Sequence, residues 1–197
     1  MANTCDTVVK MVGTVKALSD LYVALQGMNV NSKDVPLHTL AEYYGIDYEA
    51  KHIHVRGKVY FAEMENDDSG QPYMLTICVE SAWNFTDTLF DEINHLLWDE
   101  LKIAYREVEP GCEVFFVCDP IGVFPEECCV SSYGEPFEDA CEDVYATVDE
   151  AIEVWCKAMG IERGERDKET MLDLINGYEY GDDSETYFYI NEFCFEG

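Results

Sequence analysis

Two histidines separated by a single residue, His52 and His54, are the first candidates for chemistry in this sequence. On an extended strand, residues two apart face the same way, so the pair could supply half a metal site or a base beside a thiol. The neighbouring cations Arg56 and Lys58 disfavour a divalent metal ion by charge repulsion. We therefore interpret the two histidines as a solvent-facing pair on a hairpin.

Paired carboxylates are the second candidate. Glu107 and Glu109 share one face of a predicted strand, and they could hold Mg²⁺ with Glu80 or Asp119. With 41 acidic residues in a chain of 197, such pairs are expected by chance. The sequence also lacks a phosphate-binding glycine-rich loop, a GxSxG elbow and an HExxH helix. We therefore expect no catalytic residue, no metal ligand and no cofactor, and a small carboxylate- or metal-dependent enzyme is only the alternative.

The cysteines carry information about the compartment. Their number is odd, no CxxC occurs, and Cys128 and Cys129 are adjacent, which suits neither a disulfide framework nor a zinc site. Most of the others lie within apolar runs and are expected to be small buried side chains. No run of about 18 uncharged apolar residues occurs, and residues 1–13 do not resemble a secretory signal. We expect nine reduced thiols and a cytoplasmic location. The nine are Cys5, Cys78, Cys112, Cys118, Cys128, Cys129, Cys141, Cys156 and Cys194.

Charge is the largest anomaly of the composition. The chain has 41 acidic and 12 basic residues, a net charge of -29, although 48% of its residues are apolar. Residues 99–197 hold 27 of the acids against six bases. Such a surface repels nucleic-acid phosphates and anionic membranes, but it attracts the basic clefts that bind them. A surface that is acidic only for solubility is the simpler interpretation.

Hydrophobic periodicity predicts the elements of the first part of the chain. Strands are expected at residues 4–12, 102–109 and 112–119, helices at 15–27, 37–44 and 86–100, and a hairpin at 51–82. The order strand, helix, strand, strand, helix, strand is that of a ferredoxin-like split βαβ core. The fold class is therefore α+β, with a mostly antiparallel sheet that carries helices on one face.

The hairpin has the clearest local pattern. Residues 53–61 and 73–79 alternate in polarity on either side of a turn, NDDSG, and are expected to pair antiparallel; if Phe61 lies opposite Leu75, Arg56 lies opposite Glu80. Four apolar side chains of the first strand would then face the helices: Ile53, Val55, Val59 and Phe61. The other face would carry a base-rich stripe: His52, His54, Arg56 and Lys58. Its bases are expected to neutralise acids on adjacent strands such as Glu80, with contact to an acidic partner as the alternative.

The remainder of the chain is expected to extend the core. Residues 127–133 are typical of a strand, and Thr147 to Glu150 fit a capping box before a helix that Gly160 closes. Asp167 is a candidate cap for a second helix, and residues 185–196 alternate like a final strand. We therefore divide the chain into a core at 1–120 and an acidic strand-helix-helix-strand extension at 121–197, packed on the same sheet.

One stretch of the core resembles a known family. It comprises Glu80-Ser81-Ala82-Trp83, a helix, Ile103-Ala104-Tyr105, Glu107, and Glu109-Pro110-Gly111. This stretch is similar to the YubB-type ferredoxin-like domain, and the resemblance covers roughly residues 5–120. Such domains occur in proteins of plasmids and phages, and no established activity accompanies the family. The resemblance implies the fold and an origin in a mobile element.

The sequence favours an acidic intracellular binding protein that occupies a basic, nucleic-acid-binding surface of another protein. A DNA mimic that inhibits a defence nuclease would act in this way, with carboxylates in the place of phosphates. We expect direct contact with neither nucleic acid nor a membrane. The candidate partner-binding residues are Glu135, Glu138, Asp139, Glu142, Asp143, Asp149, Glu150, Asp182 and Asp183. An accessory protein whose acidity is only solubilising remains a further alternative.

Overall fold

The computed structural model describes residues 3–137, 139–181 and 185–196, and only the main chain of residues 140–142. The chain forms two compact units, one made of residues 1–123 with 195–197 and the other of residues 124–194. The fold is α+β with a mostly antiparallel sheet, as the sequence predicts. The expected boundary at residue 120 lies three residues before the observed one.

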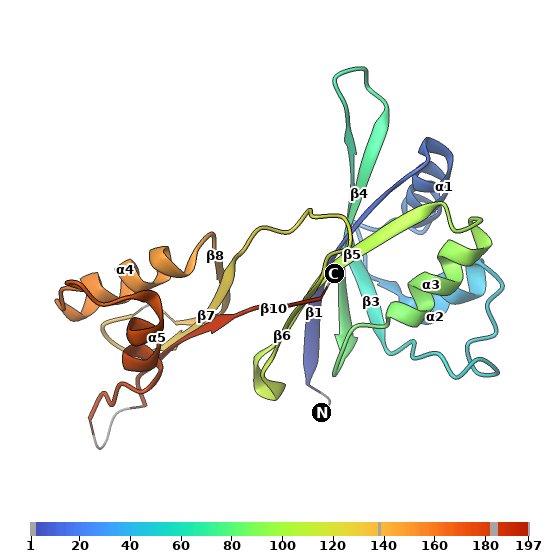
Figure 1. The fold of residues 1–197 in the computed structure, drawn as a ribbon. Coiled ribbons are helices and arrows are strands. Elements are labelled where there is room, and N and C mark those ends of the chain that lie inside the picture. Colours follow the sequence, from blue (N-terminus) through green and yellow to red (C-terminus); the bar gives the residue numbers. More distant parts are fainter. Residues whose placement is uncertain (1–2, 138, 182–184, 197) are drawn as a thin grey trace. The chain divides into compact units, whose positions relative to one another are not determined.

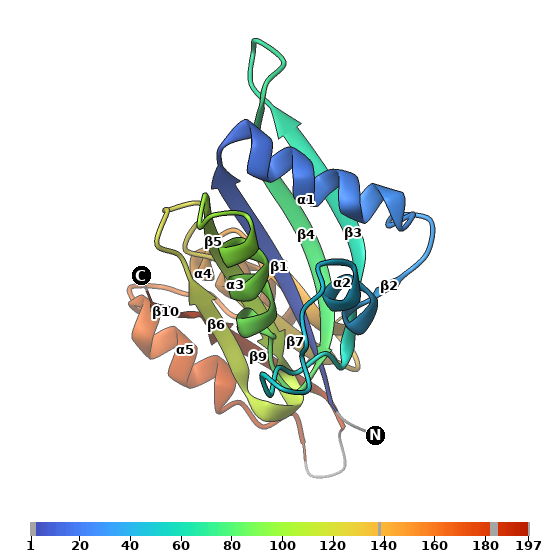
Figure 2. The same ribbon diagram turned by 90° about the vertical axis from the view of Figure 1, so that its right-hand side faces the viewer.

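The first unit is built on a seven-stranded sheet with the order β10-β6-β5-β1-β4-β3-β2 (Figure 1). Its elements are β1 (Thr4–Gly13), α1 (Val15–Gly27), β2 (Val35–Pro36), α2 (Leu37–Tyr43), β3 (Gly57–Asn66), β4 (Pro72–Ala82), α3 (Asp87–Leu96), β5 (Leu101–Glu109), the 3₁₀ turn η1 (Pro110–Cys112), β6 (Val114–Cys118) and, at the end of the chain, β10 (Cys194–Glu196). The three helices lie on one face of this sheet, as Figure 2 shows. The element order of the central part is the predicted one.

Alternation along the central strand builds the core of this unit. Cys5, Thr7, Val9 and Met11 of β1 are buried under the helices, and the residues between them are only partly buried. Helix α1 covers these side chains with residues spaced by three and four: Leu18, Leu21 and Leu25. Its first turn is capped by Thr14, whose hydroxyl accepts a hydrogen bond from the Ala17 N–H at 3.2 Å.

The predicted hairpin register is wrong. The two strands do pair antiparallel as predicted, but β3 begins at Gly57 rather than at residue 53, and Val59 lies opposite Val79, two residues beyond the position that pairing Phe61 with Leu75 would give. A bulge after Val59 shifts the register by one more residue and places Phe61 opposite Cys78. Because a bulge adds one residue to one strand, it moves every later side chain to the other face. Ala62 is therefore buried where Phe61 was expected. Alternation alone cannot reveal such an inserted residue.

The prediction that the base-rich stripe forms one face of a strand is also wrong. His52 lies in a turn with a positive φ of 56°, and His54 precedes β3, so the two histidines do not share a strand. Lys58, which is in the strand, bonds to Asp34 at 2.9 Å and to Glu80 at 3.3 Å. The predicted neutralisation of Glu80 is thus confirmed for this one lysine.

Helix α3 is shorter than expected. It ends at Leu96, and the chain leaves it through Trp98 and Asp99, both with positive φ. The sequence predicts one apolar stripe on this helix, made of Leu89, Phe90, Ile93, Leu96 and Leu97. Four of these side chains are buried, but Leu96, the last residue of the helix, is exposed.

The second unit forms a sheet of its own, with the order β8-β7-β9. Its elements are β7 (Cys128–Tyr133), β8 (Ala140–Tyr145), α4 (Val148–Met159), α5 (Lys168–Asn176) and β9 (Tyr187–Glu192). The two predicted helix caps are confirmed: Thr147 accepts from the Glu150 N–H at 3.1 Å and Asp167 from the Thr170 N–H at 2.9 Å. The predicted order of this part, strand, helix, helix, strand, did not include β8, so this strand is an addition that the structure reveals. The predicted final strand breaks at Phe193, so only β10 joins the larger sheet.

Asparagine side chains replace missing strand partners at three places. In each case the amide oxygen accepts from a main-chain N–H and the amide nitrogen donates to the carbonyl of the same residue, at 2.7–3.0 Å. The pairs are Asn31 with Ala62, Asn94 with Leu101, and Asn176 with Ile190. A carboxamide carries both a donor and an acceptor, so one side chain satisfies both groups.

Replacing Asn176 by aspartate should destabilise the second unit by about 1–3 kcal/mol, because the carboxylate can accept from Ile190 N–H but repels its carbonyl. Chemical denaturation followed by circular dichroism measures the loss. Part of it should be recovered below about pH 4, where a protonated carboxyl can donate again. Asn66→Asp, at an exposed position, is the matched control. Equal losses in both variants would contradict the bridging role.

No disulfide joins any two of the cysteines whose side chains are described: Cys5, Cys78, Cys112, Cys118, Cys128, Cys129, Cys156 and Cys194. The side chain of Cys141 lies outside the described residues. Burial raises the pKa of Cys5 from 9.0 to about 12 and that of Cys128 to about 11. Burial also raises the pKa of Tyr44 and Tyr105. These groups hold their protons more tightly in the folded chain.

The melting temperature should therefore fall steadily between pH 9 and 11. Below pH 9 the thiols are neutral in both states, so their contribution to stability is fully present. Above pH 9 the unfolded chain loses thiol protons that the folded chain keeps until about pH 11–12, so the free energy of unfolding decreases. Calorimetric melts at half-unit pH steps test this, and Cys128→Ala should make the decline shallower. A flat profile in the wild-type protein would exclude the mechanism.

Candidate functional site

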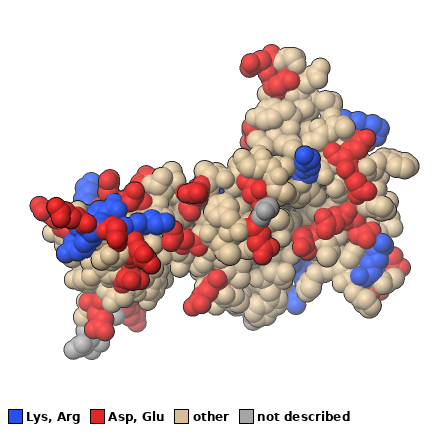
Figure 3. Space-filling model, in the orientation of Figure 1, with Lys and Arg blue, Asp and Glu red and all other residues tan. Residues whose placement is uncertain are grey.

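Negative charge is concentrated in the second unit. Residues 124–194 contain 20 acidic and four basic residues, a net charge of -16, whereas the larger first unit has 21 acidic and eight basic residues. Figure 3 shows acidic side chains spread over both units in this view, with the basic side chains of the second unit gathered over α4. The excess of acidic residues is therefore largest in the second unit, which contains all the candidate partner-binding residues.

The described candidate carboxylates come from three consecutive segments of the second unit. Strand β8 is an edge strand of that sheet, and α4 contacts it. The structure describes five candidate side chains along its connection to β7, β8 itself and the first turn of α4: Glu135, Asp139, Asp143, Asp149 and Glu150. Only the main chain of Glu142 is described, and Glu138, Asp182 and Asp183 lie outside the described residues.

These five carboxylates differ in their local roles. Asp139 accepts a hydrogen bond from the Gly134 N–H at 3.0 Å, and Asp149 pairs with Arg163 at 2.7 Å. Both therefore take part in the structure of the unit itself. Glu135, Asp143 and Glu150 are exposed. We call these three the edge carboxylates.

Three of the four basic residues of this unit bond to other residues of the same unit. Arg163 donates to the Arg166 carbonyl as well as to Asp149, and Arg166 donates to the carbonyls of Glu162 and Arg163. Lys168 pairs with Glu192 at 2.6 Å. The connection between α4 and α5 is thus tied together by its own cations. This cluster was not found by sequence reasoning, although the run IERGERDKE already holds three of these cations.

The alternative metal site does not assemble. Asp6 pairs with Glu80 and the next residue, Thr7, pairs with Glu107, so these two carboxylates lie on opposite faces of the sheet. Glu107 instead accepts from the Phe85 N–H at 2.8 Å. In the described part of the chain, no group of three or more His, Cys, Asp or Glu side chains is placed to hold a metal ion. Glu109 is almost fully buried, and one of its oxygens has no hydrogen-bond partner among the described residues.

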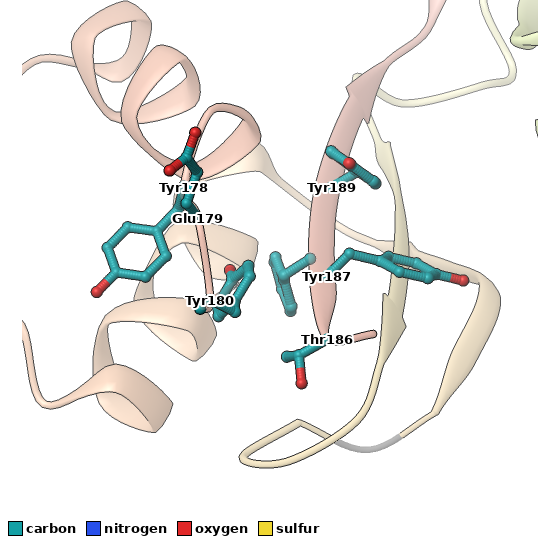
Figure 4. A pocket seen from close by; sticks show the side chains of 8 residues that line it. Tyr178, Glu179, Tyr180, Thr186, Tyr187 and Tyr189 are labelled. Carbon is teal, nitrogen blue, oxygen red and sulfur yellow. The ribbon is translucent and has the colours of Figure 1, made fainter. Parts of the chain in front are cut away.

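A tyrosine-rich cleft of about 360 Å³ is the feature that the sequence interpretation missed. Residues 178–181, after α5, form one side of it, and residues 186–189, at the start of β9, form the other (Figure 4). Tyr187 and Tyr189 stack with centroids 5.5 Å apart. Four tyrosines within twelve residues were a visible signal, but their meeting depends on the fold of the unit.

No family model matches the chain, and no curated protein or solved structure is significantly similar to it. The resemblance of residues 5–120 to the YubB-type domain therefore stays a prediction. Among the described residues, no helix has both the length and the apolar character needed to cross a membrane.

Proposed function

We propose that this protein binds the basic surface of another protein through the acidic second unit and thereby competes with nucleic acid. The supporting observation is the net charge of -16 on residues 124–194, together with the exposure of the edge carboxylates Glu135, Asp143 and Glu150. Carboxylates accept hydrogen bonds from arginine and lysine as phosphate oxygens do. Long-range attraction would also speed the encounter with a cationic cleft.

A mobile-element origin belongs to the same proposal. Inhibition of a host nuclease or transcription factor is a function that such an origin would favour. The free thiols fit action in a reducing compartment such as the cytoplasm. A carboxylate-dependent enzyme is less well supported, because Glu80 and Glu107 lie on opposite faces of the sheet.

Competition with nucleic acid is the direct test. The immobilised protein captures partners from a lysate of its host at low and at high salt, and the captured protein is then bound to labelled DNA and titrated with the free protein. Displacement of DNA at low salt supports the proposal. Capture that does not respond to salt, or a partner that keeps its DNA, favours a surface that is acidic only for solubility.

A variant with the edge carboxylates neutralised, Glu135→Gln with Asp143→Asn and Glu150→Gln, locates the binding surface. The matched control neutralises three exposed acids of the first unit, Glu42→Gln with Glu49→Gln and Asp68→Asn, and so changes the net charge equally. Only the first variant should lose DNA displacement. Equal behaviour of the two would mean that total charge, not this edge, governs binding.

A further inference from the structure

The tyrosine-rich cleft is lined by main-chain groups of β9 as well as by aromatic side chains. Ile190 of β9 directs its N–H and C=O away from β7 and toward Asn176, at 2.8 and 3.0 Å. In an antiparallel strand, residues two apart direct their main-chain groups to the same side. Phe188 therefore points its N–H and C=O away from β7 as well, on the side where Tyr178 and Tyr180 line the cleft.

The aromatic side chains are held in place from behind. Tyr180 accepts a hydrogen bond from the indole N–H of Trp155 at 2.7 Å, and the Tyr178 ring meets the same indole edge-on at 5.3 Å. Tyr189, in contrast, is 45% exposed. Because side chains alternate along β9, Tyr189 lies on the other face of the strand from Phe188 and Ile190, which pack in the core that Tyr178 and Tyr180 also contact. The accessible ring at the cleft is therefore that of Tyr189, and Glu179 adds a carboxylate to the lining. Preorganised rings reduce the entropy lost when a ligand binds.

These features match the chemistry of a guanidinium group. Arginine stacks on aromatic faces and donates hydrogen bonds in several directions, whereas lysine is a compact, strongly hydrated charge. A cation is also the complementary charge for a unit with 20 acids and four bases. We propose that the cleft receives an arginine side chain of the basic partner, which stacks on the exposed Tyr189 ring, donates to the Phe188 carbonyl and pairs with Glu179. That the arginine belongs to a partner protein rests on the proposed function. Whether the cleft binds a guanidinium group can be tested separately.

The probe is N-acetyl-arginine amide, with N-acetyl-citrulline amide as its neutral isostere and N-acetyl-lysine amide as the second cation. Titrations are followed by amide and tyrosine-ring signals in NMR spectra of the full chain. We expect saturable shifts at Phe188 and Gly181 in the millimolar range, with the arginine probe binding about fivefold more tightly than citrulline. Lysine should be intermediate. Equal affinity for arginine and citrulline would overturn the proposal.

Two variants localise the probe. Tyr189→Leu keeps apolar bulk but removes a ring face, and Glu179→Gln removes the charge while keeping the size; each should weaken arginine binding roughly threefold. The controls are Tyr43→Leu and Glu42→Gln, exposed positions of the first unit, and they should leave binding unchanged. Because Glu179 is exposed, its variant stays informative even if Tyr189→Leu disturbs the fold. Unchanged binding in Glu179→Gln together with shifts outside the cleft would refute the site.

The outcome separates this inference from the proposed function. If the arginine probe binds the cleft but the protein displaces no DNA, the cleft is a guanidinium site and the competition proposal fails. If the protein displaces DNA while arginine and citrulline bind the cleft equally, the acidic edge acts without it and the present inference fails.

Discussion

Replacing Trp155 by alanine is expected to unfold residues 124–194 while the first unit stays folded. Trp155 is fully buried at the centre of the second core, among Ala151, Ile152, Met171 and Ile175. Removing a buried tryptophan side chain costs about 3–5 kcal/mol. A unit of this size rarely has more than about 3–5 kcal/mol of stability from its core, so the loss is comparable to the whole.

Hydrogen exchange resolved by residue measures this result. Amide protection should collapse throughout 124–194 and persist in α1 and β4, which belong to the other unit. The control is Trp155→Phe, which keeps most of the ring volume but removes the N–H that Tyr180 accepts, at a cost of about 1–2 kcal/mol. If the alanine variant loses protection equally in both units, they unfold as one cooperative body and the expectation is wrong.

Neutralising the edge carboxylates should slow association with the captured partner roughly three- to tenfold at low salt, with little change in dissociation. The reason is that exposed charges act mainly on the encounter, over a screening length of about 8–10 Å near physiological salt. Surface substitutions of this kind usually change stability by only about 0.5 kcal/mol each, and relief of repulsion acts in the stabilising direction. Stopped-flow binding at several salt concentrations gives both rate constants.

The salt series contains the internal check. The difference in association rate between the wild-type and the neutralised protein should shrink as salt rises, because salt screens the same charge attraction that the substitutions remove. The control variant, in which three exposed acids of the first unit are neutralised, should keep a nearly wild-type association rate at low salt. Identical rates for all three proteins would show that the edge carboxylates Glu135, Asp143 and Glu150 do not guide the encounter.

Local patterns were sufficient for much of the fold. Helix α1 has the predicted bounds, and the caps at Thr147 and Asp167 follow from side chains that bond within three residues. Strand β8 escaped prediction because its sequence, ACEDVY, is acidic and lacks clear alternation. The bulge at β3 escaped because it depends on pairing with β4, which no single strand encodes.

The candidate site was predictable only as a region. Composition located the acidic excess, but it could not show that Asp149 is paired with Arg163, fourteen residues further along the chain. It also could not show that two tyrosine segments on either side of residues 182–185 line one cleft. Both depend on how the chain returns on itself, and that information is spread over the whole core of the unit.

The position of β10 has a consequence for synthesis. This strand completes the edge of the seven-stranded sheet beside β6, but about 75 residues separate the two in the chain. At translation rates of roughly 5–20 residues per second, β6 emerges about 4–15 s before its neighbour. During that interval the apolar strand VFFVC has an unpaired edge, which is a template for wrong pairing with other nascent chains. Closure of the larger sheet therefore depends on a segment that is synthesised only after the whole second unit.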